Sequence, residues 1–303
     1  MVRPSPPAPD PDRFRWRAGL HPLDEDTWIE LDDAWAAEVA AKRRLRAEVP
    51  GVFVSLDGSA SRSHEAVRAI GARLLTDHPD RFSVRDGEVV LVVPSGELGS
   101  GEVAVPAVVS DHPLDRVAQV VQEDLILLDE VDGVTVTTAA SVCFPTRWDP
   151  AWALGHPLAE VHGPVPRTAG RFARAIDAAI ARLEPGGRGV WRHGWTLTTD
   201  PSLRLVPGER APDPPDDPGL VGAAVWMRIE RQTLRRFAGG TVLFTVRVRR
   251  WPLAEAITTA EAAADLDDQL ARMPADVLDY KGLTRVVGPA RRWCAEQVAA
   301  LSR

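Results

Sequence analysis

Arg228-Ile229-Glu230-Arg231-Gln232 lies within residues 225–232, where apolar and polar side chains alternate along the chain. Residues 241–250 repeat the alternation, and Gly239-Gly240 stands between the two segments. A period of two is typical of a β-strand with one buried face, and a glycine pair favours the connection of a hairpin. The two segments therefore predict a pair of neighbouring antiparallel strands.

Other segments extend this sheet and surround it with helices. Strand patterns occupy residues 134–142 and 190–199, and residues 82–93 have the pattern of a hairpin broken at Asp86-Gly87. The spacing of apolar residues predicts helices over residues 24–48, 63–76, 114–128, 168–183, 259–273 and 288–301. Because no βαβ unit repeats, we expect an α+β fold, an antiparallel sheet of about five strands with flanking N- and C-terminal helices.

The composition is that of a soluble globular protein. Hydrophobic residues make up 45% of the 303-residue chain and charged residues 26%, and no apolar run is long enough for a membrane span. Residues 1–19 are rich in proline and lack the apolar core of a signal peptide. We expect a disordered leader there, followed by a single domain over residues 20–303.

The charge balance and the cysteine count exclude several functions. A net charge of −7, with basic residues dispersed among acids, disfavours a nucleic-acid partner. Cys143 and Cys294 are too few for a disulfide framework or for an iron–sulfur cluster held by this chain alone, and they fit a reduced, cytoplasmic setting. The sequence also lacks the nucleotide-binding, zinc-protease and hydrolase fingerprints.

Residues 154–166 combine three prolines with two glycines, which disfavours a continuous helix or a central strand and predicts a stiff loop. His162 lies in this loop between Val161 and Gly163-Pro164, so few backbone conformations are open to it. A histidine that is held still can serve as a metal ligand or an acid–base group. The alternative is a structural or surface histidine that only forms a hydrogen bond.

Charged residues inside the predicted strands and helices also allow two interpretations. Arg228, Glu230 and Arg231 would be costly in a buried strand unless they found partners. Either this face is exposed to water, or the three side chains pair with one another and with an anionic ligand. Glu123 and Asp124 fall within the predicted helix 114–128, where adjacent side chains do not converge, so we interpret them as part of a solvated face.

Seven short motifs occur in order along the chain and together resemble the haem-dependent oxidative N-demethylase family. The resemblance extends from about residue 20 to near the C-terminus. The motifs are Gln122-Glu123-Asp124-Leu125-Ile126-Leu127-Leu128, Phe144-Pro145 with Trp148, Val161-His162-Gly163-Pro164-Val165-Pro166, Arg192 with Trp195, Arg228-Ile229-Glu230-Arg231-Gln232-Thr233-Leu234, Phe244-Thr245-Val246-Arg247 and Tyr280-Lys281-Gly282.

The resemblance implies a PAS-like antiparallel sheet that binds haem b. In such an enzyme the haem activates O2 to oxidise an N-methyl group of a small amine such as dimethylamine. The resemblance also implies that electrons come from a reduced pyridine nucleotide through a flavin and an iron–sulfur centre on a partner, an electron-donating reductase or ferredoxin-type subunit. The small number of cysteines and the missing nucleotide-binding fingerprint agree with the placement of these redox groups on a partner.

The resemblance further implies roles for single residues. His162 would be the axial ligand of the haem iron and so the metal-binding residue. Glu230 would be the buried counter-charge of the cationic amine, with Arg228 beside it in the catalytic group. The arginines Arg192, Arg231 and Arg247 would bind the cofactor by pairing with the haem propionates. Trp195 would be a further cofactor-binding residue.

The chain departs from the family's pattern at His156, at Gly194 and at Phe237-Ala238. These departures affect the prediction of the substrate more than the prediction of haem binding, because Gly194 removes a polar side chain from a candidate pocket wall. Two other hypotheses stay open. One is a haem-binding or gas-sensing PAS-type module without turnover, and the other is a haem-free binding protein of the same fold.

Overall fold

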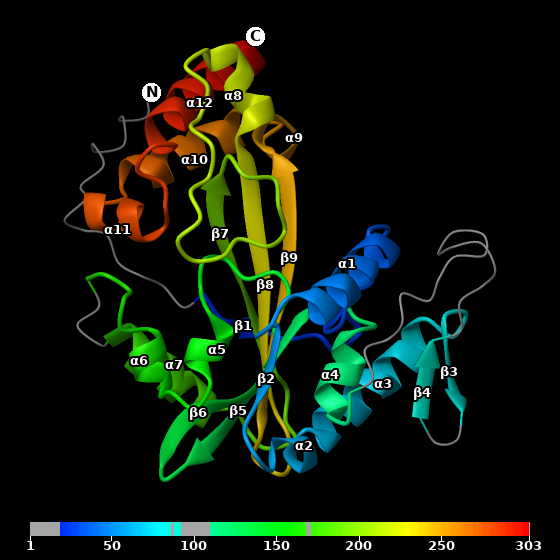
Figure 1. Ribbon diagram of the computed structural model, residues 1–303. Helices are drawn as coiled ribbons and strands as arrows, with labels where there is room; N and C mark the ends of the chain where they lie inside the picture. Colours follow the sequence, from blue (N-terminus) through cyan, green and yellow to red (C-terminus); the bar gives the residue numbers. More distant parts are fainter. Residues whose placement is uncertain (1–18, 86–87, 92–109, 168–170, 303) are drawn as a thin grey trace, which may run out of the picture.

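The computed structural model describes residues 19–85, 88–91, 110–167 and 171–302. Its centre is a seven-stranded sheet with the order β1-β7-β8-β9-β5-β6-β2, in which all neighbouring strands are antiparallel (Figure 1). Five of its strands are long: β5 (Asp124–Val131), β6 (Val134–Ser141), β7 (Val190–Thr198), β8 (Trp226–Arg236) and β9 (Val242–Pro252). The short strands β1 (His21–Pro22) and β2 (Phe53–Ser55) form the two edges.

The expected α+β architecture and its antiparallel sheet are confirmed, although two short edge strands bring the number above five. Residues 225–232 and 241–250 form the β8–β9 hairpin, in which Trp226 lies opposite Pro252. Strands β3 (Phe82–Arg85) and β4 (Glu88–Leu91) pair as a separate hairpin, as residues 82–93 predict. The turn at 86–87 and the predicted leader up to residue 18 lie outside the described residues.

The helices form three groups around the sheet in Figure 1. The first group lies near the β3–β4 hairpin and contains α1 (Trp35–Glu48), α2 (Ser59–Arg62), α3 (His64–Asp77) and α4 (Pro113–Ala118). The second lies beside β5 and β6 and contains α5 (Pro150–Ala153), α6 (Leu158–Val161) and α7 (Arg171–Ala181). The third covers one end of β7–β9 and contains α8 (Pro218–Ala224), α9 (Leu253–Ala256), α10 (Ala260–Ala271), α11 (Ala275–Tyr280) and α12 (Val287–Leu301).

The predicted helix 114–128 is wrong in its second half, where the chain forms strand β5. Every residue from Asp124 to Asp129 in this strand is buried. A strand buried on both faces reads as a continuous apolar run, and such a run also satisfies the three- and four-residue steps of a helix. Pairing with β6 and β9, which the local sequence does not contain, decided between the two.

Two other boundaries also differ from the prediction. The helix expected over 24–48 begins only at Trp35, after a single 3-10 turn at Glu25–Thr27. Before it, Leu23 and Trp28 enter the core from irregular backbone, where each is 0% exposed. The stiff loop expected around His162 contains the short helix α6, and His162 is its C-terminal cap residue.

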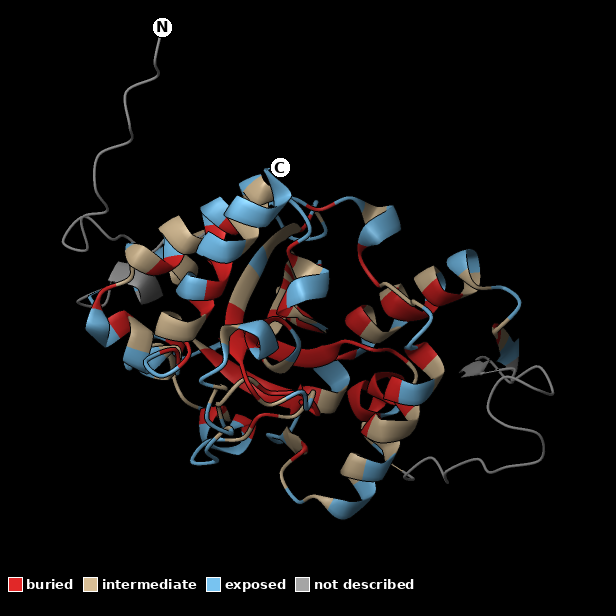
Figure 2. Cartoon of the chain, turned by 90° about the horizontal axis from the view of Figure 1, so that it is seen from above, coloured by how far each residue is buried: buried red, intermediate tan, exposed pale blue. Residues whose placement is uncertain are grey.

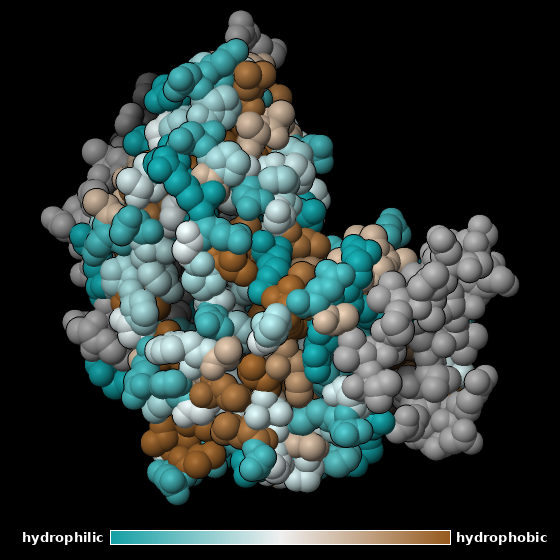
Figure 3. Space-filling view, viewed as in Figure 1, coloured by the Kyte–Doolittle hydropathy of each residue, from teal (hydrophilic) through white to brown (hydrophobic). Residues whose placement is uncertain are grey.

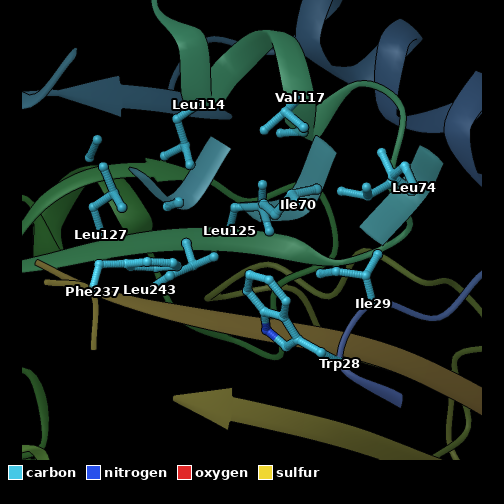
Figure 4. Close-up of a cluster of buried hydrophobic side chains, with 14 of the residues drawn as sticks. Trp28, Ile29, Ile70, Leu74, Leu114, Val117, Leu125, Leu127, Phe237 and Leu243 are labelled. Atoms are coloured by element: carbon cyan, nitrogen blue, oxygen red, sulfur yellow. The ribbon is translucent and has the colours of Figure 1, made fainter. Parts of the chain in front are cut away.

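Alternation along the strands separates the two faces of the sheet. One face is covered by a large apolar cluster that includes Trp28, Ile70, Leu125 and Leu243, and Figure 4 shows these side chains converging between the sheet and the N-terminal helices. The residues next to them in the strands, such as Ile126 and Val242, belong to a second cluster on the other face. That second face carries the cavity described below.

Burial is concentrated in the sheet and in the inward helix faces, while the outer helix faces are exposed (Figure 2). The view in Figure 3 is mostly hydrophilic, with apolar atoms gathered at its lower edge. Val131 and Val134, at the tip of the β5–β6 hairpin, are 39% and 44% exposed. Among the described residues, no helix is both long enough and apolar enough to span a membrane.

Candidate functional site

A cavity of about 1030 Å³ opens on the second face of the sheet, between the long strands and helices α6, α7, α10 and α11. This volume is at the upper end of the roughly 300–1,000 Å³ that ligand pockets occupy. Strand alternation explains which residues reach it. Arg192, Gly194 and Thr196 of β7 lie opposite Gln232, Glu230 and Arg228 of β8 in the register, and all six line the cavity.

One end of the cavity is apolar. Helix α7 contributes Ile176 and Ile180, and α6 contributes Leu158. The sheet side of this end is also apolar, with side chains from β5, β7, β8 and β9: Ile126, Leu128, Val190, Leu234, Phe244 and Val246. Such a wall favours the apolar body of a ligand.

His162 lies at this end, where α6 stops. Its Nδ1 is 2.8 Å from the carbonyl oxygen of Leu158. A carbonyl can only accept, so Nδ1 carries the hydrogen, and the lone pair of the neutral ring is on Nε2. Burial lowers the pKa of His162 and the nearby Arg192 lowers it further, against the opposing effects of the Leu158 hydrogen bond and of Asp177. The imidazole is therefore neutral at physiological pH, the form that binds metals.

The other end of the cavity is polar and centres on Glu230. Its Oε1 accepts a hydrogen bond from the hydroxyl of Thr146, and its Oε2 accepts one from Nε2 of Gln232 at 2.7 Å. Gln232 in turn accepts a 2.7 Å bond at Oε1 from Nε of Arg192. Two neutral donors, Thr146 and Gln232, thus hold the carboxylate in one orientation, and Gln232 links it to the guanidinium of Arg192.

Arg228 is 1% exposed and is occupied with backbone and hydroxyl oxygens. Its Nε donates to Oγ1 of Thr146 at 2.8 Å, and its Nη2 donates to the carbonyl oxygen of Phe144 at 2.8 Å. The guanidinium therefore ties β8 to the loop after β6. Arg228 lines the cavity as expected, but its contacts make it a residue that positions Thr146 and Glu230.

Tyr280 and Lys281 of the Tyr280-Lys281-Gly282 motif line the cavity. Nζ of Lys281 donates to the carbonyl oxygen of Trp195 at 2.6 Å and lies 5.2 Å from the centroid of the Trp195 ring. Gly282 has a φ of +68°, and a Cβ there would lie 1.7 Å from Nη1 of Arg147. Glycine adopts this φ without strain, and a side chain here would force the Arg147 guanidinium to shift.

Two residues expected at the cofactor lie on the opposite face of the sheet. Nε of Arg231 is 3.5 Å from Oε1 of Glu30, and Nη1 of Arg231 donates to the carbonyl oxygen of Trp28. Arg247 is 1% exposed and pairs with Asp32 at 2.7 Å and Glu38 at 2.8 Å. The structure therefore does not bring Arg231 or Arg247 to the cavity, because odd-numbered residues of β8 and β9 point away from it.

Glu123 and Asp124 are 1% and 2% exposed, so the prediction of a solvated face is wrong. Oδ1 and Oδ2 of Asp124 accept hydrogen bonds from the backbone nitrogens of Cys143 and Phe144, at 2.8 and 2.9 Å. This carboxylate fixes the turn that leads to Thr146. This role of Asp124 was missed because a helix was predicted there, whereas only a strand directs Asp124 toward the cavity.

Sequence reasoning also assigned no role to Thr146, Gln232 or Lys281, which complete the polar end. Gln232 and Lys281 stand in quoted motifs. Gln232 bonds Glu230 within β8 and Arg192 of β7, whereas Lys281 bonds Trp195 of β7. Of the three departures from the family's pattern, Gly194 lines the cavity, whereas His156 stacks on Trp152 with ring centroids 4.9 Å apart. Phe237 is buried in the apolar cluster on the opposite face.

An α+β protein with a large amphipathic cavity, a neutral imidazole at the apolar end and a fixed carboxylate at the polar end is of the class that encloses a small molecule or prosthetic group. Residues 19–290 match the family described as haem-dependent oxidative N-demethylase, alpha subunit-like. The chain belongs to this family.

The residues present fit the haem that the family name implies. His162 supplies a neutral imidazole whose Nδ1 hydrogen is bound by Leu158, the arrangement that orients a metal-ligating histidine. The apolar wall suits a porphyrin body. Arg192 and Arg147 supply guanidinium groups in the same cavity, which suit carboxylates such as the propionates.

Proposed function

We propose that this chain is the haem b-binding catalytic component of an oxidative N-demethylase that acts on a small N-methyl amine, such as dimethylamine. The observation that carries the proposal is that one cavity contains both the neutral imidazole of His162 and the fixed carboxylate of Glu230. When bound, haem supplies the activation of O2 for oxidation of the N-methyl group.

In this proposal each residue of the cavity has a separate role. His162 would hold the haem iron, and Arg192 would hold a propionate. Trp195 closes the wall beside them. Glu230 holds the ammonium group of the substrate, because a small secondary amine is protonated at neutral pH and a carboxylate is its natural partner. Thr146 and Arg228 keep Glu230 oriented, and the apolar wall keeps bulk water from the reacting groups.

The proposal places the other redox groups on a partner. A pyridine nucleotide gives up a hydride, so a flavin must accept it and release single electrons, which an iron–sulfur centre can carry to the haem. We assign both groups to an electron-donating reductase or ferredoxin-type subunit. The chain's two cysteines, both buried and not bonded to each other, support this assignment and a reducing, cytoplasmic setting. The five long antiparallel strands around one cavity support a single PAS-like haem-binding unit over residues 20–303.

Two measurements test the proposal. The purified chain should bind haem with a Soret band and a pyridine haemochrome typical of haem b. With NADPH, O2, an N-methyl amine and a flavodoxin- or ferredoxin-type reductase, it should release aldehyde, and omission of the reductase should abolish release. A chain that refuses haem rejects the proposal. A chain that binds reducible haem but releases no aldehyde with any reductase fits the sensor hypothesis.

A further inference from the structure

Lysine is nearly missing from this chain. Of its 36 Lys and Arg residues, two are lysines, Lys42 and Lys281. Lys42 is 1% exposed, and its Nζ, on the inner side of α1, donates to the carbonyl oxygens of Val121 and Glu123. Lys281 lies in the cavity wall. The chain thus uses arginine for nearly every cationic side chain and places one of its two lysines in the cavity wall.

The backbone and side chain of Lys281 are both held. Oγ1 of Thr196 donates to its carbonyl oxygen at 3.2 Å, and Nη1 of Arg147 approaches the same oxygen at 3.5 Å. Its Nζ donates to the carbonyl oxygen of Trp195 and lies over the Trp195 ring. A side chain tethered at both ends presents its amine to the cavity in one place.

The charges around this amine come from several elements. Arg192 on β7 and Arg147 in the loop after β6 are cationic, Glu230 on β8 is anionic, and α10 contributes Asp268 and, at its C-terminal end, Arg272 to the same cavity. Burial lowers the pKa of Lys281 to about 8, with Arg192 acting in the same direction and Glu230 against it. Near pH 8 the amine is therefore neutral about half of the time, as lysine nucleophiles require, whereas a guanidinium would stay charged.

We propose that Lys281 is a carbonyl-reactive amine that condenses reversibly with a small aldehyde in the cavity. We further infer that this aldehyde is the one-carbon product of demethylation, a step that rests on the proposed function. Formaldehyde is small enough to enter the cavity, and its carbonyl carbon is the electrophile that a neutral amine attacks.

The chemistry needs no oxidant or reductant. The lone pair of Nζ forms a bond to the carbonyl carbon, and the carbonyl oxygen leaves as water after receiving the two hydrogens of the amine. The product is an imine at Lys281, and addition of water reverses each step. Aldehyde formed in the cavity would thus be held at Lys281 before it escapes.

The test is reductive trapping in the full chain. Formaldehyde and picoline–borane are added between pH 6.5 and 9.5, and methylated lysines are located by peptide mass mapping. The borane delivers hydride to the imine carbon, so N-methyl-lysine marks the amine that condensed. We expect methylation at Lys281 with a rate that rises through pH 8, and none at Lys42.

An Arg44→Lys variant provides a matched exposed amine, because Arg44 lies on the outer face of α1. An ordinary lysine has a pKa of about 10.4, so at pH 7.5 Lys281 should react at least about tenfold faster than the introduced amine. The Lys281→Arg variant should lose the label in the 281 peptide and retain the fold. Labelling of Lys281 no faster than that of the exposed amine, or with a midpoint near pH 10, overturns the proposal.

A second arm separates this inference from the proposed function. During turnover with amine, NADPH and a reductase, but without added formaldehyde, borane should trap the methyl group at Lys281. If added formaldehyde labels Lys281 while turnover produces no aldehyde, the amine site stands and the proposed function fails. If turnover releases aldehyde while neither arm labels Lys281, the proposed function stands and the amine site fails.

Discussion

Nε of Arg228 donates a 2.8 Å hydrogen bond to Oγ1 of Thr146, and the same hydroxyl donates to Oε1 of Glu230. A single hydroxyl therefore joins a buried cation to the carboxylate proposed to bind the amine. It also connects strand β8 to the loop that Asp124 holds in place. This relay makes the orientation of Glu230 depend on a loop residue that no sequence motif pointed to.

Replacement of Thr146 by Val should remove both bonds at nearly constant volume. A buried guanidinium and a carboxylate would each lose a partner, so the free energy of unfolding should fall by about 1–3 kcal/mol. Urea denaturation measures the change. Thr146→Ser keeps the hydroxyl and should stay close to the wild type. Equal stability of the Val variant and the wild type would show that the relay contributes nothing.

Replacement of His162 by Ala should remove the proposed haem ligand. Haem content or the position of the Soret band should change, while the far-ultraviolet circular dichroism stays the same, since α6 is one short turn. His64→Ala is a suitable control, because His64 is exposed at the start of α3. An unchanged Soret band and unchanged haem content in the His162 variant would reject His162 as the haem ligand.

Replacement of Glu230 by Gln should weaken binding of the cationic amine. A hydrogen bond to a charged group contributes about 1.5–3 kcal/mol, so KM for the amine should rise about ten- to a hundredfold. Haem binding should be retained. Glu261→Gln, on the exposed surface of α10, controls for the change of net charge. If the two variants have the same KM, the ammonium group binds elsewhere.

Replacement of Gly282 by Ala should destabilise the protein for two reasons, a φ of +68° and the contact with Arg147. Gly133 has a φ of +77°, and a Cβ added there would meet nothing within 4 Å. Gly133→Ala therefore reports the backbone cost alone, about 1–2 kcal/mol. The excess at Gly282 should disappear in the double variant with Arg147→Ala. An excess that persists in the double variant would contradict a steric origin.

Lys281 should make stability depend on pH in a defined window. Its folded pKa of about 8 is below the unfolded value of about 10.4, so between these values the unfolded chain binds more protons. The wild type should therefore gain stability relative to Lys281→Met as pH rises from 8 to 10. Chemical denaturation of both proteins at several pH values measures the difference. A difference that does not vary over this range would mean that the pKa is not lowered.

The local pattern of apolar and polar residues was enough to predict much of the fold. Alternation along residues 225–232 and 241–250 predicted the β8–β9 hairpin, because a half-buried strand imposes a period of two on its own side chains. The same period of two directs Arg228, Glu230 and Gln232 to one face of β8, where all three line the cavity. The ordered motifs also indicated the family to which the chain belongs.

What the local sequence could not supply was the identity of each strand's neighbours. The run Leu125-Ile126-Leu127-Leu128 satisfies helix and buried strand equally, and only pairing with β6 and β9 made it a strand. That pairing turned Asp124 from an expected surface residue into a buried one. Arg231 and Arg247 were assigned to the cofactor by motif, yet the pleat directs them to acids on the opposite face. Gln232 meets Glu230 within one strand. Thr146 and Lys281, in contrast, meet Glu230 and Trp195 only because segments distant in sequence pack against one sheet, and such long-range contacts leave no periodic trace in the sequence.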